Sequence, residues 1–367
     1  MATDAAPTEV VGPTLGGYLV EYVDWRLIFF INVPVGIIGA IAAVMVLPKF
    51  PAVKSQKFDV LGFLTIAGGL FALLLALSEG QDWGWTGYRV ISLLSASVIL
   101  LALFVIIELE VEHPLLDVRV FRYWPYTNSL LLISVLMVGL FATLFYIPLF
   151  LQQAQGLGAF DAGVLLLPQA LVMAVLMPIA GRLYDKIGPR WPAVIGLTVV
   201  AIGTYALHGI TLDISKGEIA ALLALRAGGM GLAMMPVMTG GVAAVPTNKV
   251  GAASAFNNVA QRSAAALGLA ILTAMMTSQQ AGMLQDRTSM IGADTPMPSL
   301  LPGASGEMVG MYAVYQRTSL QVFAAALDQL MLITAGLTLV GVALAFLLRS
   351  GPAKTSPDSG SAASAAH

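Results

Sequence analysis

The 367-residue sequence contains no cysteine and few charged residues. The absence of cysteine excludes disulfide bonds, thiolate nucleophiles and cysteine-based zinc sites. Only 10% of the residues are charged, against roughly 25% in globular proteins whose whole surface faces water. The net charge of −2 and the dispersed cations exclude the clustered basic surface that binds nucleic acid. Most of the surface must therefore face something other than water, and lipid is the obvious candidate.

Hydrophobic residues make up 58% of the sequence, and the mean hydropathy is +0.85. Crossing a hydrocarbon core of about 30 Å takes about 20 apolar residues in a helix. Runs of this kind lie at 27–47, 60–78, 90–109, 128–151, 163–181, 192–211, 219–245, 256–278 and 325–348, with a shorter apolar run at 10–20. We expect helices throughout, because backbone groups in lipid must be paired within their own segment and no long alternating pattern indicates a barrel. The predicted fold is an all-α polytopic membrane protein.

The distribution of lysine and arginine predicts the orientation, because cytoplasmic loops carry an excess of both residues. Twelve of the 18 lysines and arginines fall on the side that includes the C-terminus. These are Lys49, Lys54, Lys57, Arg119, Arg122, Arg182, Lys186, Arg190, Lys249, Arg262, Arg349 and Lys354. We therefore expect a cytoplasmic C-terminus.

Two motifs stand out. Between two predicted spans, the segment 181–190 reads G-R-L-Y-D-K-I-G-P-R, which predicts a tight cytoplasmic turn with Asp185 available to a neighbouring cation or a helix N-terminus. Near the start, Gly12-Pro13-Thr14-Leu15-Gly16-Gly17 is followed by a segment at 24–36 that contains Asn32 and Pro34. Proline and clustered glycine predict a bent, closely packed helix there.

The first motif resembles the signature loop of the major facilitator superfamily, and the second resembles spans five and six of its fourteen-span drug:proton antiporters of the EmrB/QacA type. The resemblance implies a helix bundle that lacks about the first four spans. It divides the chain into 1–26, a remnant of the fifth span with an outer loop; 27–47, the sixth span; 48–122, an extra central helix pair with a cytoplasmic linker; 123–349, the C-terminal six-helix half; and 350–367, a tail expected to be disordered. The glycine four residues before the Gly-Pro pair of the family pattern is absent, since Thr8 stands there.

The function implied by this resemblance is efflux across the inner membrane, namely proton-coupled export of lipophilic compounds by alternating access when the transporter is intact. The alternatives are a truncated membrane fragment that does not transport and an exporter of one specific endogenous solute. The partners would be the bilayer, a small lipophilic substrate and protons. A periplasmic adaptor protein is a further candidate partner. We expect no enzyme activity, because no paired acids, histidine cluster or nucleophile with its base occurs within the spans, and we expect no cofactor or metal.

The residues expected to act follow from the motifs and from polar groups in the spans. The gating loop would use Gly181, Arg182, Asp185, Lys186, Gly188 and Arg190, and the antiporter-type motif Gly12, Pro13, Gly16 and Gly17. Polar side chains that either line a cavity or pair helices are Gln152, Gln153, Gln169, Arg226, Asn257, Asn258, Gln261 and Arg262. We expect Arg226 to extend toward the outer headgroups, with a cavity-facing role as the alternative. From the positions of the twenty acidic residues, we expect no carboxylate at the centre of the bilayer. We expect His208 near the outer interface.

Overall fold

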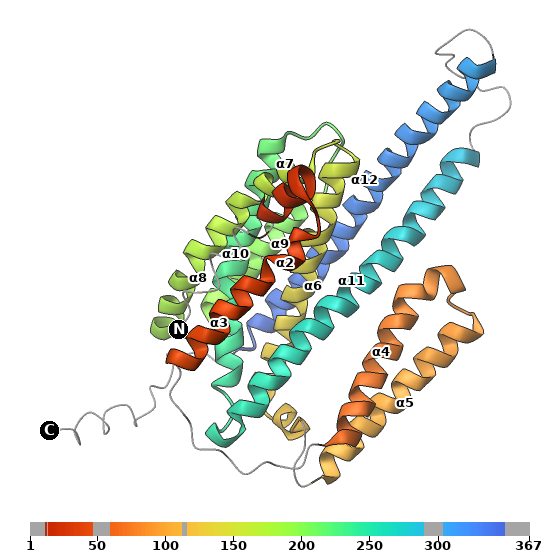
Figure 1. Ribbon diagram of the computed structural model, residues 1–367. Coiled ribbons are helices and arrows are strands. Elements are labelled where there is room, and N and C mark those ends of the chain that lie inside the picture. The colour runs from red at the N-terminus through yellow and green to blue at the C-terminus, as the bar shows by residue number, and fades with distance from the viewer. Residues whose placement is uncertain (1–11, 13, 47–58, 112–115, 290–303, 349–367) are drawn as a thin grey trace.

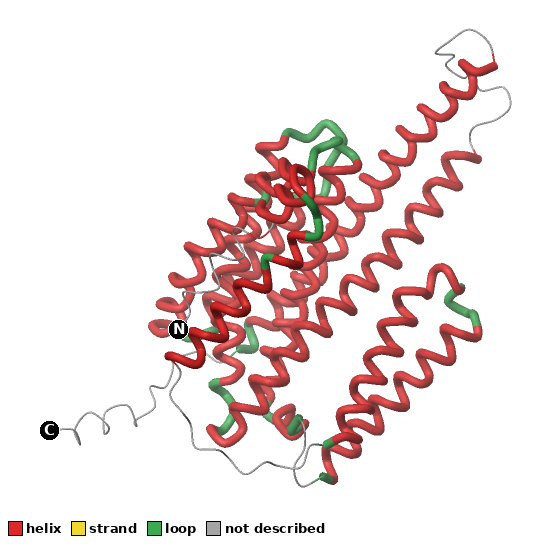
Figure 2. Tube along the Cα trace, viewed as in Figure 1, coloured by secondary structure: helices red, strands yellow, loops and turns green. Residues whose placement is uncertain are grey.

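The computed structural model describes residues 12, 14–46, 59–111, 116–289 and 304–348. Across these residues the secondary structure is helical, with the helices running roughly side by side (Figures 1 and 2). The elements are η1 (Leu19–Val23), α2 (Leu27–Phe30), α3 (Asn32–Val46), α4 (Val60–Trp83), α5 (Tyr88–Glu110), η2 (Val118–Arg122), α6 (Trp124–Gln153), α7 (Ala159–Leu165), α8 (Leu167–Ile187), α9 (Arg190–Ala206), α10 (Lys216–Val242), η3 (Thr247–Lys249), α11 (Val250–Ser289) and α12 (Ala304–Ala345). The expected all-α architecture is confirmed.

Eight of the described helical stretches are long and apolar enough to cross a membrane. They correspond to eight of the nine predicted spans. The remaining prediction, 192–211, corresponds to α9, which has 17 residues and ends at Ala206. At 1.5 Å per residue this helix is about 26 Å long, slightly shorter than a typical hydrocarbon core. Pro168 falls within the predicted span 163–181 and lies in the first turn of α8, where its missing N–H costs no helical hydrogen bond.

Helices α11 and α12 are much longer than the predicted spans. They contain 40 and 42 residues, so each is about 60 Å long, roughly twice the thickness of a hydrocarbon core. Figure 1 shows both helices extending beyond the rest of the bundle at the end where they connect. The predicted spans cover only 256–278 and 325–348. The residues after 278 in α11 and before 325 in α12 are helical as well, so the two helices continue beyond the predicted spans.

Glycine lets α10 pack closely between α8 and α9. A Cβ atom on Gly196 of α9 would lie 2.6 Å from the carbonyl oxygen of Gly229 and 2.8 Å from the Cβ of Ala233. On the face of α10 toward α8, a Cβ on Gly231 would lie 3.2 Å from the carbonyl oxygen of Met173. Small residues allow such backbone approach where no hydrophobic effect drives helices together in lipid. Helix α10 is therefore the centre of this part of the bundle.

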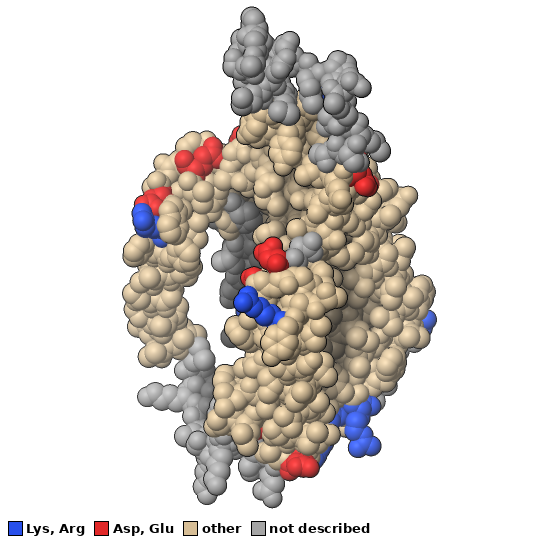
Figure 3. Space-filling model, turned by 90° about the vertical axis from the view of Figure 1, so that its right-hand side faces the viewer, with Lys and Arg blue, Asp and Glu red and all other residues tan. Residues whose placement is uncertain are grey.

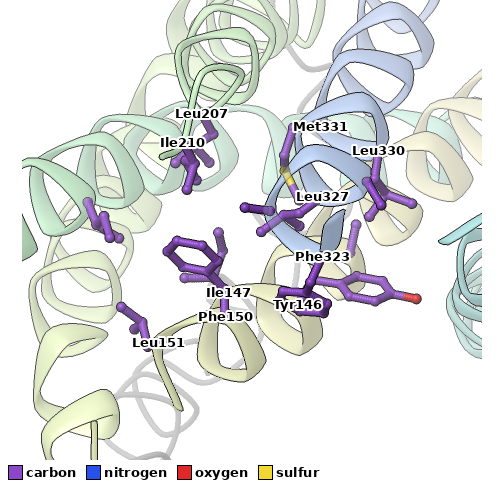
Figure 4. Packing of buried hydrophobic residues seen from close by; sticks show 14 of the residues in the cluster. Tyr146, Ile147, Phe150, Leu151, Leu207, Ile210, Phe323, Leu327, Leu330 and Met331 are labelled. Atoms are coloured by element: carbon purple, nitrogen blue, oxygen red, sulfur yellow. The ribbon is translucent and has the colours of Figure 1, made fainter. Parts of the chain in front are cut away.

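A hydrophobic core joins α6, α12 and the connection between α9 and α10. Figure 4 shows its side chains converging from these elements. The labelled residues are Tyr146, Ile147, Phe150, Leu151, Leu207, Ile210, Phe323, Leu327, Leu330 and Met331. Eight of them are 0–2% exposed in the structure, as expected for side chains that must be packed tightly to hold bundled helices in register.

Helices α2 and α3 differ from the bundle, because the stretch Leu27–Val46 has no buried residue. The preceding helical segment is attached instead: the backbone N–H of Phe160 in α7 donates to Glu21 Oε2 at 2.8 Å. Helices α4 and α5 form a hairpin that packs against α11 through α4. The face in Figure 3 carries few charged side chains, which is typical of a surface in contact with lipid.

An ion pair joins Asp117, just before η2, to Lys249 of η3, just before α11. Lys249 Nζ lies 2.9 Å from Asp117 Oδ2, and the backbone N–H of Arg119 donates to Asp117 Oδ1 at 3.0 Å. Burial alone would raise the pKa of Asp117. The lysine and the N–H outweigh burial, and the pKa is lowered. The ion pair therefore holds the segment before α6 against the N-terminal end of α11.

Candidate functional site

A cavity of about 570 Å³ lies among α6, α8, α10 and α11. Three of these helices line it with the same spacing, i, i+3, i+4 and i+7, which is one face of an α-helix. The three stripes are Met137, Leu140, Phe141 and Leu144; Leu166, Gln169, Ala170 and Met173; and Asn258, Gln261, Arg262 and Ala265. Met234 of α10 and Gly12 complete the lining. The volume is that of a typical small-molecule site.

Polar groups enter the cavity from two of these helices. Asn258, Gln261 and Arg262 lie on α11, and Gln169 lies on α8. Gln169 Oε1 is buried and has no hydrogen-bond partner among the described residues. A buried acceptor without a partner is costly unless a ligand or water supplies a donor. The arrangement can hold a molecule with a lipophilic body and a few polar groups.

The other four polar residues named from the sequence do not line this cavity. Gln152 and Gln153 are exposed at the end of α6. Asn257 is 2% exposed, on a different side of α11 from its neighbour Asn258. Sequence reasoning missed the apolar residues of α6, Met173 and Met234. On α8, the lining residues have the same i, i+3, i+4 and i+7 spacing as those on α11. Applying this spacing from Gln169 would have identified the other lining residues on that side of α8.

Arg226 is the fourth polar residue that does not line the cavity. Its environment corrects the expectation that its side chain reaches the headgroups. It is 2% exposed within the packing of α6, α9 and α10. Its Nε donates to Thr204 Oγ1 at 3.0 Å, and Nη2 donates to the carbonyl oxygen of Gly139. The headgroups are out of reach because α6 and α9 enclose the side chain. Among the described residues no carboxylate lies within 4 Å of its guanidinium.

The signature segment is mostly helix, where the sequence analysis expected a turn from 181 to 190. Residues 181–187 form the last turns of α8, and the turn itself is Gly188 and Pro189 before α9 begins at Arg190. A Cβ on Gly181 would lie 3.1 Å from Met235 Sδ, and a Cβ on Gly240 would lie 2.7 Å from the Cβ of Pro189, so both ends of the segment contact α10. Arg182, Asp185 and Lys186 are exposed, and they form no ion pair with other described residues. Their role in gating stays a prediction.

Gly188 is expected to be required for this turn. Its φ of 82° and ψ of −176° lie in a region that is accessible essentially only to glycine. We expect Gly188→Ala to lower the free energy of unfolding by about 1–3 kcal/mol, measured by denaturation of the protein in mixed micelles. Gly217→Ala is the control, because a Cβ there meets nothing within 4 Å and the φ is ordinary. Equal stability of both variants would contradict the strain argument.

The glycines of the antiporter-type motif lie in different surroundings. Gly12 lines the cavity, whereas a Cβ on Gly16 would meet nothing within 4 Å. Gly17 packs against Ala159 at the start of α7, close enough that a Cβ would lie 2.9 Å from its carbonyl carbon. Pro13 lies outside the described residues. The motif thus brings the start of the chain to both α7 and the cavity.

Apart from Arg262, no ionisable residue among those described lines the cavity. His208, just past the end of α9, has Nδ1 2.8 Å from Asp328 Oδ1 of α12, and the backbone N–H of Gly209 donates to the same carboxylate. In the part of the chain that the structure describes, no group of three histidine or acidic residues could hold a metal ion. The cavity lining contains no acidic residue among those described.

Comparison with known proteins places these features in a family context. The model of the Major Facilitator Superfamily matches residues 8–269. The uncharacterized MFS-type transporter YhcA of Bacillus subtilis strain 168 is 35% identical over 282 residues, which are 76% of this chain and 53% of that protein. The tetracenomycin C resistance and export protein of Streptomyces glaucescens is 30% identical over 281 residues, with coverages of 75% and 52%.

The lincomycin resistance protein LmrB of Listeria monocytogenes is 29% identical over 299 residues, with coverages of 82% and 63%. The chain therefore spans about half the length of the curated relatives that it matches. These relatives are named as transporters or as resistance proteins, and none of the three is named as an enzyme.

Proposed function

The chain belongs to the Major Facilitator Superfamily, and on that basis we propose that it forms one wall of the substrate pathway of an exporter for lipophilic compounds. The observation that carries the proposal is the cavity, in which three helices each present one face. Two relatives named for antibiotic resistance or export support it. The finer features are also proposals: the fourteen-span antiporter type, location in the inner membrane, a cytoplasmic C-terminus, and a periplasmic adaptor as partner.

Alternating access and proton exchange are part of this proposal. Transporters of this kind place substrate near the bilayer midplane between two units that rock about it. The cavity supports this part of the proposal, because it lies among α6, α8, α10 and α11, in a bundle whose centre is the glycine-packed α10. The carboxylate that would carry the proton is not among the described cavity residues.

Binding to the cavity is directly testable with the neutral lipophilic dye Nile red. Ala265 lines the cavity and is 6% exposed, whereas the next residue, Ala266, is exposed on another face of α11. We expect Nile red to raise the unfolding temperature of the solubilised protein, because a ligand that binds only the folded state stabilises it. Ala265→Trp should weaken the apparent affinity about tenfold or more by filling the cavity. Ala266→Trp should leave it unchanged, and equal effects of both variants would contradict binding at this site.

A transport measurement separates export from the alternative readings. Cells that lack their main exporters are loaded with Nile red, and its loss is followed with and without a protonophore. Energy-dependent loss that Ala265→Trp abolishes and Ala266→Trp retains supports export. Retention equal to that of cells without the protein, at matched protein levels in the membrane, supports a membrane protein that does not transport by itself. Export of one endogenous solute but not of the dye would favour a specific exporter.

A further inference from the structure

The charge in the cavity has one sign. Arg262 of α11 is the charged residue among those that line it, and its side chain is exposed. No carboxylate of the described residues lies within 4 Å of its guanidinium. A guanidinium remains charged at any physiological pH. The cavity therefore offers a fixed positive charge that no protein group described here neutralises.

Uncharged hydrogen-bonding groups surround this charge. Asn258 and Gln261 lie four residues and one residue before Arg262, and both side chains line the cavity. Gln261 Nε2 is 3.8 Å from Met238 Sδ, which is a weak acceptor, so this amide retains most of its capacity to donate. Amide and guanidinium donors together suit an oxyanion, because hydrogen bonds to a charged acceptor are about twice as strong as neutral ones.

The rest of the lining is mostly apolar. Leu140, Phe141 and Leu144 come from α6, and Met173 and Met234 come from α8 and α10. Methionine and phenylalanine adapt to ligands of different shape and contact aromatic rings favourably. A ligand that fills the cavity would therefore put its lipophilic body on α6 and its anionic group on α11.

From this arrangement we infer that the cavity selects lipophilic anions, compounds with an aromatic body and a carboxylate, phenolate or sulfonate group, and that Arg262 determines this preference. The inference rests on the proposed function, because it names the substrate class of the same cavity. Permanent lipophilic cations are disfavoured, since they would have to be buried beside a guanidinium with no carboxylate to offset the repulsion.

The test uses two probes of the same shape and opposite charge, tetraphenylborate and tetraphenylphosphonium. Apparent affinities are obtained from the rise in unfolding temperature of the solubilised full chain with probe concentration. We expect the wild-type protein to bind the anion about tenfold more tightly than the cation, after subtraction of the partition into micelles without protein. Arg262→Gln should bring the ratio close to one, Arg262→Lys should retain it, and Arg262→Glu should reverse it.

Arg122→Gln is the matched control, because Arg122 is exposed in η2 at the same end of the molecule and does not line the cavity. It should keep the wild-type ratio. Equal affinities in the wild-type protein, or a ratio that Arg262→Gln leaves unchanged, would overturn the inference. Its failure is distinct from that of the proposed function: selective anion binding without export of Nile red overturns only the function, and export with no charge preference overturns only the inference.

Discussion

Gly196→Val is expected to destabilise the folded protein by about 3 kcal/mol or more. A Cβ at this position would lie 2.6 Å from the carbonyl oxygen of Gly229 and 2.7 Å from the backbone nitrogen of Ala233. Both are backbone atoms of a helix, so no side chain can rotate away. Helices α9 and α10 would have to separate, and packing would be lost along the whole contact.

The matched control is Gly336→Val in α12. A Cβ there meets nothing within 4 Å, and the residue is exposed. Valine has a slightly better helix propensity than glycine, so the free energy of unfolding should change by less than about 0.5 kcal/mol. Both variants would be unfolded by titration with sodium dodecyl sulfate and followed by circular dichroism. A Gly196→Val protein as stable as Gly336→Val would refute the close contact of α9 and α10.

Arg226→Ala is expected to lower the free energy of unfolding by about 2–4 kcal/mol. The substitution leaves a void among three helices, and large-to-small changes in a core cost about 2–5 kcal/mol. It also removes the hydrogen bonds to Thr204 and Gly139 that join α10 to α9 and α6. The opposing effect is relief from burying a charge that no described carboxylate neutralises. The void dominates, because alanine fills little of the space that the long side chain occupies.

Arg226→Met isolates the two effects. Methionine fills most of the volume without a charge, so we expect it to be within about 1 kcal/mol of the wild-type protein, or more stable. The difference between the alanine and methionine variants, measured by the same titration, then reports the void. If the methionine variant lost as much free energy of unfolding as the alanine variant, the loss would come from the two hydrogen bonds and not from the void. Arg226 would then stabilise the fold through these hydrogen bonds despite its buried charge.

The sequence predicted the bundle well because its signal is local. A run of about 20 apolar residues contains nearly all the information needed to identify a spanning helix. The ends of α11 and α12 escaped prediction for the same reason: these turns contain more polar residues than the spans do, and hydropathy does not distinguish a polar helix from a loop. The turn predicted over residues 181–190 is much shorter in the structure, because residues 181–187 are helical and only Gly188 and Pro189 separate α8 from α9.

The site was predictable only in part, because it depends on helix register. Asn257 and Asn258 are equivalent in composition, yet successive residues of a helix point about 100° apart, and only Asn258 lines the cavity. The surroundings of Arg226 come from Thr204 and Gly139, which are 22 and 87 residues away in sequence. No local pattern specifies such contacts, whereas Gln169, Gln261 and Arg262 could be named because polar residues are rare in apolar runs.

Because α11 is long and continuous, a small tilt of the helix near the cavity produces a larger displacement at its far end. Asp286 lies 24 residues beyond Arg262 on one continuous helix, a distance of about 36 Å along its axis. If α11 tilted by about 5° around a point near Arg262, Asp286 would move by about 3 Å. A displacement of this size can be measured with a pair of spin labels. Since the chain has no native cysteine, labels can be attached at single introduced thiols. The far end of α11 is thus a place to read small movements of the cavity from outside it.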